Sequence, residues 1–191
     1  LISGTRAMKV KTKSYDAFES VNFPYIAEIK HDKIMYNKYI SRYFRPKVNK
    51  LTLKEKVCEN IAVLKIFPGI DTELFTYVQS KYKGVIVESF GIGGIPFENK
   101  DVASKIREMT EQNMAVVVTT QCLEEGVDLD IYEVGKKLPA DKIIFARDMN
   151  TEALVAKLMC ALGRFDNLDD VKNFIEKPIM FDSNVDYSKN P

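Results

Sequence analysis

The chain has 191 residues, enough for one complete hydrophobic core or for a core and a fragment of a second. Hydrophobic residues make up 46% and charged residues 29%, as in soluble globular proteins, and no apolar run approaches the ~20 residues of a membrane span. The formal net charge of +1 creates no field that would favour nucleic acid, an anionic membrane or an acidic substrate.

The first quarter of the chain shows no regular pattern. We expect a short strand over residues 6–10, a turn-rich loop over 16–24 and an irregular linker over 25–50. The linker mixes aromatic and basic residues, a combination that also occurs in proteins that bind single-stranded nucleic acid. Because the overall charge is balanced, basic side chains lying along apolar surface are the favoured interpretation, and we expect no nucleic-acid partner.

From residue 57 onwards, strand and helix patterns alternate. Apolar runs predict strands over 61–67, 84–90, 114–120 and 143–145. Capping residues and helical periodicity predict helices from Asp71 or Thr72 to about Lys81, over 99–112 and 130–137, from Thr151 to about Leu162 with Gly163 as the stop, and over 166–176. This alternation predicts an α/β fold, a small open and mostly parallel sheet flanked by helices on both faces.

Ligands of such sheets bind beyond the carboxyl ends of the strands, and three predicted loops meet that condition. They are residues 68–69, 91–96 and 119–126. The middle loop, Gly91-Ile92-Gly93-Gly94, is not a dinucleotide fingerprint, because Pro96 stands where the last glycine is needed, and it lacks the Gly-Lys-Ser/Thr end of a P-loop. A tight packing turn and a ligand loop both remain open for it.

Cysteine and histidine chemistry is limited in this sequence. Three widely spaced cysteines suit reduced cytosolic thiols better than disulfides, namely Cys58, Cys122 and Cys160. Cys122 with the single histidine, His31, is a conceivable nucleophile and base, but a small half-buried thiol is the favoured interpretation. A His-rich metal site is excluded, and we expect no metal.

Two charged features are further candidates. An acidic run could bind a metal ion or a substrate ammonium group, although such runs are usually solvated loops; it comprises Glu124, Glu125, Asp128 and Asp130. Lys9 stands in a strand-like segment, where a buried lysine could activate a hydroxyl nucleophile. From spacing alone, Lys9 is a surface lysine.

Six stretches carry a resemblance when they are taken in chain order. They are Thr5–Lys9, Asp16–Asn22, Leu64–Gly69, Gly84–Pro96, Val116–Cys122 and Asp148–Ala153. Together they resemble the cytoplasmic, type I bacterial L-asparaginases over nearly the whole chain. No single stretch is decisive, but their shared order is fairly specific.

The resemblance implies a division of the chain and a chemistry. Residues 1–24 would end a large N-terminal domain, 25–50 would be a linker and 51–191 a smaller C-terminal domain. Members of that family hydrolyse L-asparagine to L-aspartate and ammonia through a threonine nucleophile, without metal or cofactor. Lys9 falls at the family's catalytic lysine, which helps to deprotonate that threonine. The resemblance further implies a cytoplasmic homo-oligomer, a dimer or tetramer, with asparagine as substrate and possible effector.

The family's Gly-Thr-Gly nucleophile segment and its Thr-Asp segment are absent from this sequence. Since the chain begins at Leu1 rather than at a methionine, we expect both segments upstream of Leu1. We therefore expect the 191-residue chain to have no asparaginase activity by itself.

Some type I enzymes bind asparagine at an allosteric site, and the resemblance is incomplete there. Cys122 matches the cysteine of that site, but Met8 replaces a threonine and Glu88 stands near the position of an arginine. We expect the effector site to be missing or altered.

Groups that reach a neighbouring active site in the family also differ. Gly94 stands in place of an asparagine, and Glu124 or Glu125 is a loose match for a glutamate of the periplasmic relatives. The substrate or effector loops are thus assigned to Ser89, Gly91, Gly93, Gly94, Cys122 and Glu124.

Two other functions stay open. An asparaginase-like subunit of glutamyl-tRNA amidotransferase shares the architecture, and a stand-alone α/β module that binds a small molecule without chemistry belongs to a different class. The sequence does not decide between asparagine and glutamine as substrate.

Overall fold

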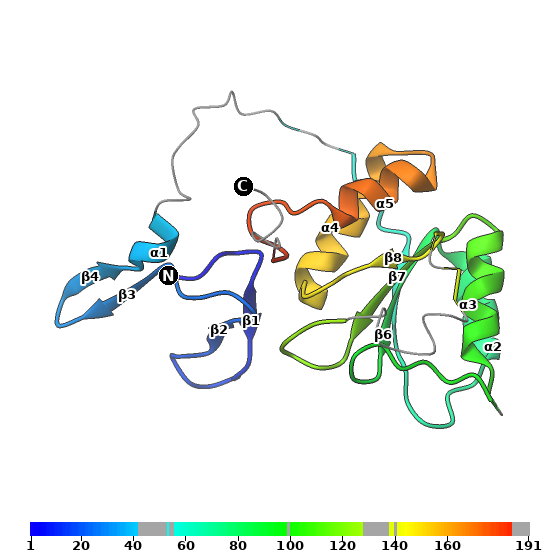
Figure 1. Cartoon of the computed structure of the whole chain (residues 1–191), viewed down its shortest axis with the longest axis horizontal. Helices are drawn as coiled ribbons and strands as arrows, with labels where there is room; N and C mark the ends of the chain where they lie inside the picture. Colours follow the sequence, from blue (N-terminus) through cyan, green and yellow to red (C-terminus); the bar gives the residue numbers. More distant parts are fainter. Residues whose placement is uncertain (42–52, 54–55, 99, 128–137, 140, 185–191) are drawn as a thin grey trace.

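A four-stranded parallel sheet organises the larger part of the molecule. The computed structural model describes residues 1–41, 53, 56–98, 100–127, 138–139 and 141–184 (Figure 1). The strands follow chain order across the sheet: β5 (Ile61–Lys65), β6 (Gly84–Ser89), β7 (Ala115–Thr120) and β8 (Ile144–Phe145). Every neighbouring pair of these strands is parallel, which confirms the predicted α/β fold.

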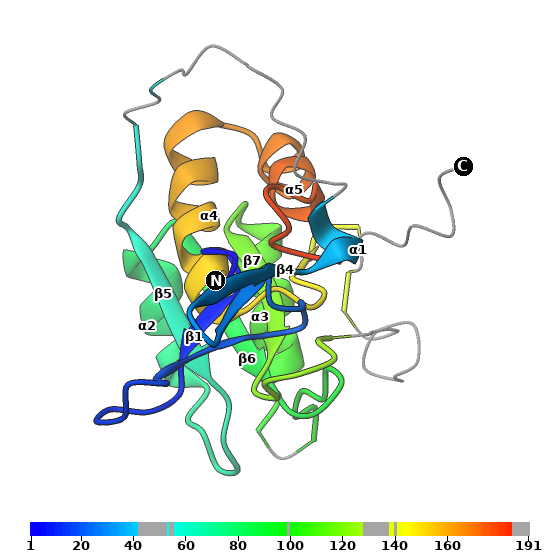
Figure 2. The same ribbon diagram turned by 90° about the vertical axis from the view of Figure 1, so that its left-hand side faces the viewer.

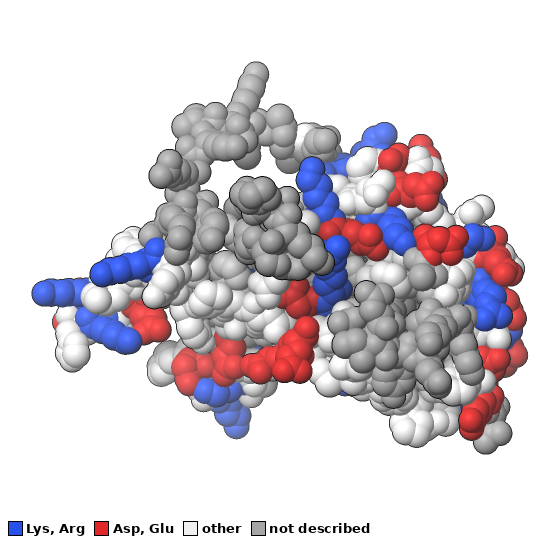
Figure 3. Space-filling model, in the orientation of Figure 1, with Lys and Arg blue, Asp and Glu red and all other residues white. Residues whose placement is uncertain are grey.

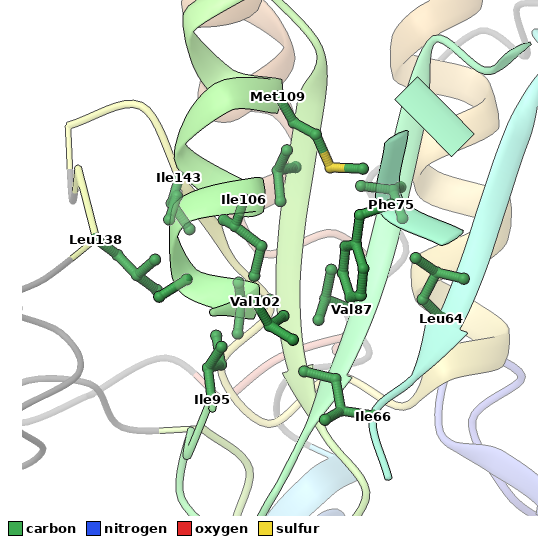
Figure 4. Packing of buried hydrophobic residues seen from close by; sticks show 14 of the residues in the cluster. Leu64, Ile66, Phe75, Val87, Ile95, Val102, Ile106, Met109, Leu138 and Ile143 are labelled. Atoms are coloured by element: carbon green, nitrogen blue, oxygen red, sulfur yellow. The ribbon is translucent and has the colours of Figure 1, made fainter. Parts of the chain in front are cut away.

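Helices cover both faces of this sheet. On one face lie α2 (Glu73–Lys81) and α3 (Val102–Glu111), and on the other α4 (Thr151–Arg164) and α5 (Leu168–Glu176). Figure 4 shows the first core, where Phe75 of α2 and Met109 of α3 lie against Val87 of β6. The preceding residue of β6, Ile86, belongs to the second core with Leu158 of α4. Because the central strands are buried on both faces, their sequences are continuous apolar runs.

Helix α4 differs from the prediction at both ends. Its N-cap is Asn150, whose Oδ1 accepts a hydrogen bond from the Ala153 N–H at 2.9 Å, so Thr151 is the first helical residue rather than the cap. The helix also continues through Gly163. A Cβ at Gly163 would lie 2.5 Å from the Lys56 carbonyl oxygen, so this glycine permits close packing instead of stopping the helix.

Helix α2 agrees with the prediction, with Thr72 at its N-cap and Lys81 as its last residue. The helices expected over 99–112 and 166–176 are shorter than predicted. Helix α3 is capped by Asp101, which accepts from the Ser104 N–H, and α5 by Asn167. The helix expected over 130–137 falls outside the described residues, as does Asn99.

Two antiparallel hairpins occupy the N-terminal part (Figure 2). The first joins β1 (Ala7–Lys9) to β2 (Phe18–Ser20), and the second joins β3 (Ala27–Lys30) to β4 (Lys33–Tyr36), before the short α1 (Lys38–Ser41). The expectation of an irregular linker from residue 25 is therefore wrong for the second hairpin. Its turn places His31 and Asp32 at φ values of 49° and 59°, the left-handed pair of a two-residue type I′ turn.

Candidate functional site

A cavity of about 150 Å³ lies at the carboxyl ends of β5, β6 and β7. Strand β1 closes one side of it, and the segment before α4 closes another. The lining residues are Met8, Asn22, Lys65, Glu88, Thr119–Leu123, Gly126 and Asp148–Thr151. The cavity thus lies where ligands of parallel sheets bind, as the strand pattern predicts.

Hydrogen bonds fasten the strand ends around this cavity to one another. Gln121 donates from Nε2 to the Ile66 carbonyl at 2.5 Å and to the Glu88 carbonyl at 3.0 Å. Thr120 donates from Oγ1 to the Gly91 carbonyl and accepts from the Cys122 N–H at 3.0 Å. The loops after β5, β6 and β7 are therefore held together. The hydrogen bond from the Cys122 N–H to Thr120 fixes the position of Cys122.

Two carboxylates, Glu88 and Asp148, line the cavity; Asp148 is paired with Arg6, and Glu88 is half-buried without an ion-pair partner among the described residues. Its Oε1 accepts a hydrogen bond from Thr151 Oγ1 at 2.7 Å, which links the end of β6 to the start of α4. The second carboxylate oxygen has lone pairs for a donor on a ligand. This end of the cavity suits an ammonium or amide N–H group and disfavours a ligand carboxylate.

The glycine loop after β6 folds as a tight turn beside the cavity. Phe90 and Gly94 exchange backbone hydrogen bonds of 2.9 and 2.7 Å, and Gly91 and Gly93 have φ values of 49° and 132°. The positive φ at Gly93 explains a glycine there. None of the three assigned glycines (Gly91, Gly93, Gly94) is among the cavity-lining residues.

The other assigned residues divide between wall, core and surface. The structure brings Cys122 together with Glu88 and Met8 in the cavity wall. Ser89 is buried and donates to the Thr119 carbonyl at 2.6 Å, a bond that ties β6 to β7. Glu124 is exposed and does not line the cavity.

Lys9 lies at the end of β1, outside the cavity. Strand alternation directs its side chain to the face opposite that of Met8, and Phe18 lies across from it on β2. The Lys9 side chain is exposed, so its ammonium group is open to another polypeptide segment.

A buried arginine, which the sequence pattern did not single out, joins β1 to the α/β part. Arg6 has no exposed surface, and its Nη1 lies 2.9 Å from both Oδ2 and the carbonyl oxygen of Asp148. Its Nε donates to the Phe181 carbonyl at 2.5 Å. Asn22 adds a bond from Nδ2 to the same Asp148 carbonyl at 2.9 Å. The signal was present in two of the six resembling stretches, 5–9 and 148–153, but their pairing is visible only in three dimensions.

Neither metal ligation nor a membrane span has a candidate within the described ranges. No group of three or more His, Cys, Asp or Glu side chains there could hold a metal ion. No helix among these residues is long and apolar enough to cross a membrane.

Two family models match the chain. The glutaminase/asparaginase C-terminal domain matches residues 60–175, and the asparaginase N-terminal domain matches residues 1–42. The first match covers the parallel sheet and its helices, and the second covers both hairpins.

Similar proteins include both L-asparaginases and glutamyl-tRNA(Gln) amidotransferase subunits. An L-asparaginase of Thermococcus kodakarensis is 32% identical over 181 residues, which are 94% of this chain and 53% of that protein. A glutamyl-tRNA(Gln) amidotransferase subunit of Methanosphaera stadtmanae is 29% identical over 188 residues, 98% of this chain and 42% of that protein. The chain thus spans about half the length of the relatives that it matches.

Solved structures agree in fold. The L-asparaginase structure from T. kodakarensis superposes with a TM-score of 0.84 at 31% identity, over 95% of this chain and 54% of that one. L-asparaginase I from Vibrio cholerae gives a TM-score of 0.83 at 24% identity, with the same coverage of 95% and 54%.

Proposed function

The chain belongs to the glutaminase/asparaginase family, and on this premise we propose that it is the C-terminal portion of an L-asparaginase. The reaction is hydrolysis of L-asparagine to L-aspartate and ammonia, with a threonine hydroxyl as nucleophile. The observation that carries the proposal is the ordered match of the N-terminal model to residues 1–42 and of the C-terminal model to residues 60–175.

Lys9 is the catalytic residue that we assign to this chain. It would help to remove the proton of the threonine nucleophile, together with an aspartate. We place this threonine and this aspartate in the part of the N-terminal domain that lies outside the 191 residues. Its exposure supports this role, because a threonine on another segment can approach the amine. By the same reasoning the 191-residue chain alone is inactive.

The domain division and the setting are part of the proposal. We propose that residues 1–24 end the N-terminal domain and that 51–191 form the C-terminal domain. Within the expected linker, 25–50, the reach of the N-terminal model to residue 42 favours grouping the second hairpin with the first. The assembled enzyme is a cytoplasmic dimer or tetramer that needs no cofactor. The three free thiols of this chain agree with a reducing compartment.

The cavity beside Cys122 is proposed as an altered effector site. Cys122, Met8 and Glu88 all line it, so the three positions singled out by the resemblance are in one place. The Glu88 carboxylate repels the carboxylate of an amino acid at the place where an arginine would bind it. Asparagine is therefore expected to act as substrate and to bind weakly or not at all here.

The amidotransferase function is the second candidate, favoured by the match of the M. stadtmanae amidotransferase protein to 98% of the chain. Both candidates share the amide hydrolysis and differ in the fate of the ammonia. An amidotransferase component would deliver ammonia to glutamyl-tRNA(Gln), so its amidase activity should rise when that tRNA and the remaining components are added.

A fusion protein tests the proposal. The N-terminal part of the T. kodakarensis L-asparaginase that this chain does not match is joined to Leu1, and ammonia release is measured with asparagine and with glutamine. We expect release from asparagine by the fusion protein and none by the 191-residue chain. Ammonia release by the chain alone would contradict the assignment of the nucleophile to the other part. A well-folded but inactive fusion protein would favour the non-catalytic module.

A further inference from the structure

The first hairpin, β1 and β2, is not held in place by a hydrophobic core. Its strands form a separate two-stranded sheet, and neither core cluster contains a residue of either strand. A two-stranded hairpin is only marginally stable in water when nothing else supports it. Strand β1 lies beside the first turn of α4 in both views (Figure 1 and Figure 2). The position of Lys9, the last residue of β1, therefore depends on polar contacts between the hairpin and the α/β part.

Asp148 makes the charged contact of this kind. Arg6 lies directly before β1, and its Nη1 is 2.9 Å from both Oδ2 and the carbonyl oxygen of Asp148. Arg6 adds nothing to the charged surface that Figure 3 shows, because it has no exposed surface of its own. Within the described part of the chain, Asp148 is its ion-pair partner, and Arg6 Nη2 has no hydrogen-bond partner there. Asp148 is thus the group that neutralises this buried cation.

The segment that carries Asp148 also contacts the rest of the hairpin. Asn22, just after β2, donates from Nδ2 to the Asp148 carbonyl at 2.9 Å. Asn150 Nδ2 lies 3.5 Å from the carbonyl oxygen of Ala7 in β1. Both strands of the hairpin are therefore attached to residues 148–150, and the pair with Arg6 is the only charged and fully buried one of these attachments.

The attachment at Arg6 sets the position of Lys9. The two residues are three positions apart on an extended segment, which is about 10 Å at ~3.3 Å per residue. Because β1 is short and extended, a shift or tilt at Arg6 moves Lys9 with it. A group that transfers a proton must lie within hydrogen-bond reach of that proton, and a misplacement of about 1 Å costs roughly 100-fold in rate.

We propose that Asp148 is a positioning residue for Lys9. By holding Arg6, it fixes β1 and with it the Lys9 amine at the place where the threonine nucleophile is to lose its proton. This inference rests on the proposed function. It gives the α/β part of the chain a role in a reaction whose nucleophile we place elsewhere.

Asp148→Asn tests the proposal in the fusion protein with the T. kodakarensis N-terminal part. The substitution removes the charge that pairs with Arg6 and nearly keeps the shape of the side chain. It should lower kcat for asparagine roughly 10- to 100-fold and leave KM unchanged, because Lys9 is assigned to proton transfer and not to substrate binding. In the Lys9→Met background the same substitution should lower kcat no further, since Asp148 acts through Lys9.

Two further variants separate positioning from stability. Gly163→Ala is the control, because it strains the contact of α4 with Lys56, which involves no residue of the hairpin. It should leave kcat unchanged at temperatures where the variant is folded. Arg6→Lys is the milder variant, to be used also if Asp148→Asn does not fold. It keeps the cation but loses the planar fork that reaches Asp148 and the Phe181 carbonyl together, so kcat should fall and KM should stay the same.

A second measurement on the 191-residue chain needs no activity. The Val10 N–H donates to the Ala17 carbonyl at 2.8 Å and the Val21 N–H to the Arg6 carbonyl at 2.9 Å, so these two bonds flank the ladder between β1 and β2. Amide hydrogen exchange at Val10 and Val21 should become about tenfold faster or more in Asp148→Asn, because the hairpin opens more often without its attachment. Gly163→Ala should leave both rates unchanged.

Each outcome decides the proposal. Faster exchange, together with a loss of kcat that is absent in the Lys9→Met background, supports it. Unchanged exchange, an equal loss of kcat in Gly163→Ala or a further loss in the Lys9→Met background overturns it. Faster exchange with unchanged kcat also overturns it, because Lys9 then works without this attachment. An inactive unaltered fusion protein contradicts the proposed reaction instead, and the exchange rates alone then decide whether Asp148 holds β1.

Discussion

Arg6 and Asp148 form a buried ion pair with 2.9 Å between Nη1 and Oδ2, although they lie 142 positions apart in the chain. Arg6 lies directly before strand β1 and three residues before Lys9. The pair therefore joins the start of β1 to the segment that precedes α4 and lines the cavity. Asp148 Oδ1 also accepts from the Asn184 N–H at 2.8 Å, so the C-terminal segment enters the same network. This ion pair and the hydrogen bond from Asn22 Nδ2 to the Asp148 carbonyl thus both join the two family-matched regions.

Replacing Arg6 with Met should strongly destabilise the chain. The substitution leaves the Asp148 carboxylate largely buried without its cation, which costs about 3–5 kcal/mol of unfolding free energy. Urea denaturation of the 191-residue chain measures this. Lys11→Met is the control, because the Lys11–Asp16 ion pair is exposed and should contribute nothing measurable. Equal effects of the two substitutions would show that Arg6 does not hold the regions together.

The sheet was predictable because its central strands are buried on both faces and therefore consist of continuous apolar runs. The runs predicted over 61–67, 84–90 and 114–120 place the ends of β5, β6 and β7 within two residues of the observed ones, and the cavity forms at those ends. The Arg6–Asp148 pair was not predictable, because an arginine in a polar stretch carries no sign that it is buried. The second hairpin was missed because its turn uses His31 and Asp32 instead of a glycine, so the alternation of β3 and β4 was interpreted as a linker.

Replacing Gly163 with Ala should destabilise the chain, in contrast to the usual effect in a helix. In an exposed helix interior this change stabilises by about 1 kcal/mol. Here the new Cβ would lie 2.5 Å from the Lys56 carbonyl oxygen, so the backbone before β5 has to move, at a cost of about 1–3 kcal/mol. Thermal or urea unfolding gives the sign directly. A more stable variant would mean that the helix and residue 56 are not packed this closely.

Because Lys157 is buried, its titration should raise the free energy of unfolding as the pH increases in the alkaline range. Its Nζ lies 2.7 Å from Asp182 Oδ2 and donates to the Lys177 carbonyl at 2.7 Å. Burial lowers the pKa of Lys157 below its ordinary 10.5, although Asp182 opposes the shift. Between the lowered pKa and 10.5 the unfolded chain binds a proton that the folded chain has released. Stability therefore rises with pH in that window.

The comparison that isolates this effect is between the unaltered chain and Lys157→Met. Their difference in unfolding free energy should move in favour of the unaltered chain as the pH approaches 10.5 from below, by at most about 1.4 kcal/mol per pH unit. Urea titrations at several alkaline pH values measure it. A difference that is constant or that moves in favour of Lys157→Met would contradict the lowered pKa.

Replacing Lys9 with Met should separate activity from stability. In the fusion protein with the T. kodakarensis N-terminal part, loss of a group that assists proton transfer should lower kcat by roughly 10²- to 10⁴-fold. The unfolding midpoint of the 191-residue chain should stay the same, because the Lys9 side chain is exposed. An active Lys9→Met fusion protein would remove Lys9 from the catalytic assignment.

Asparagine should bind the assembled enzyme at a single class of sites. The cavity that we propose as an altered effector site has Met8 and Glu88 at the two replaced positions, and neither side chain can donate a hydrogen bond to a ligand carboxylate. Titration calorimetry on the fusion protein, with Lys9→Met to prevent turnover, measures the number of classes. A second class that disappears in Cys122→Ala but persists in Cys58→Ala, a half-buried thiol that does not line the cavity, would show that the effector site is retained despite both replacements.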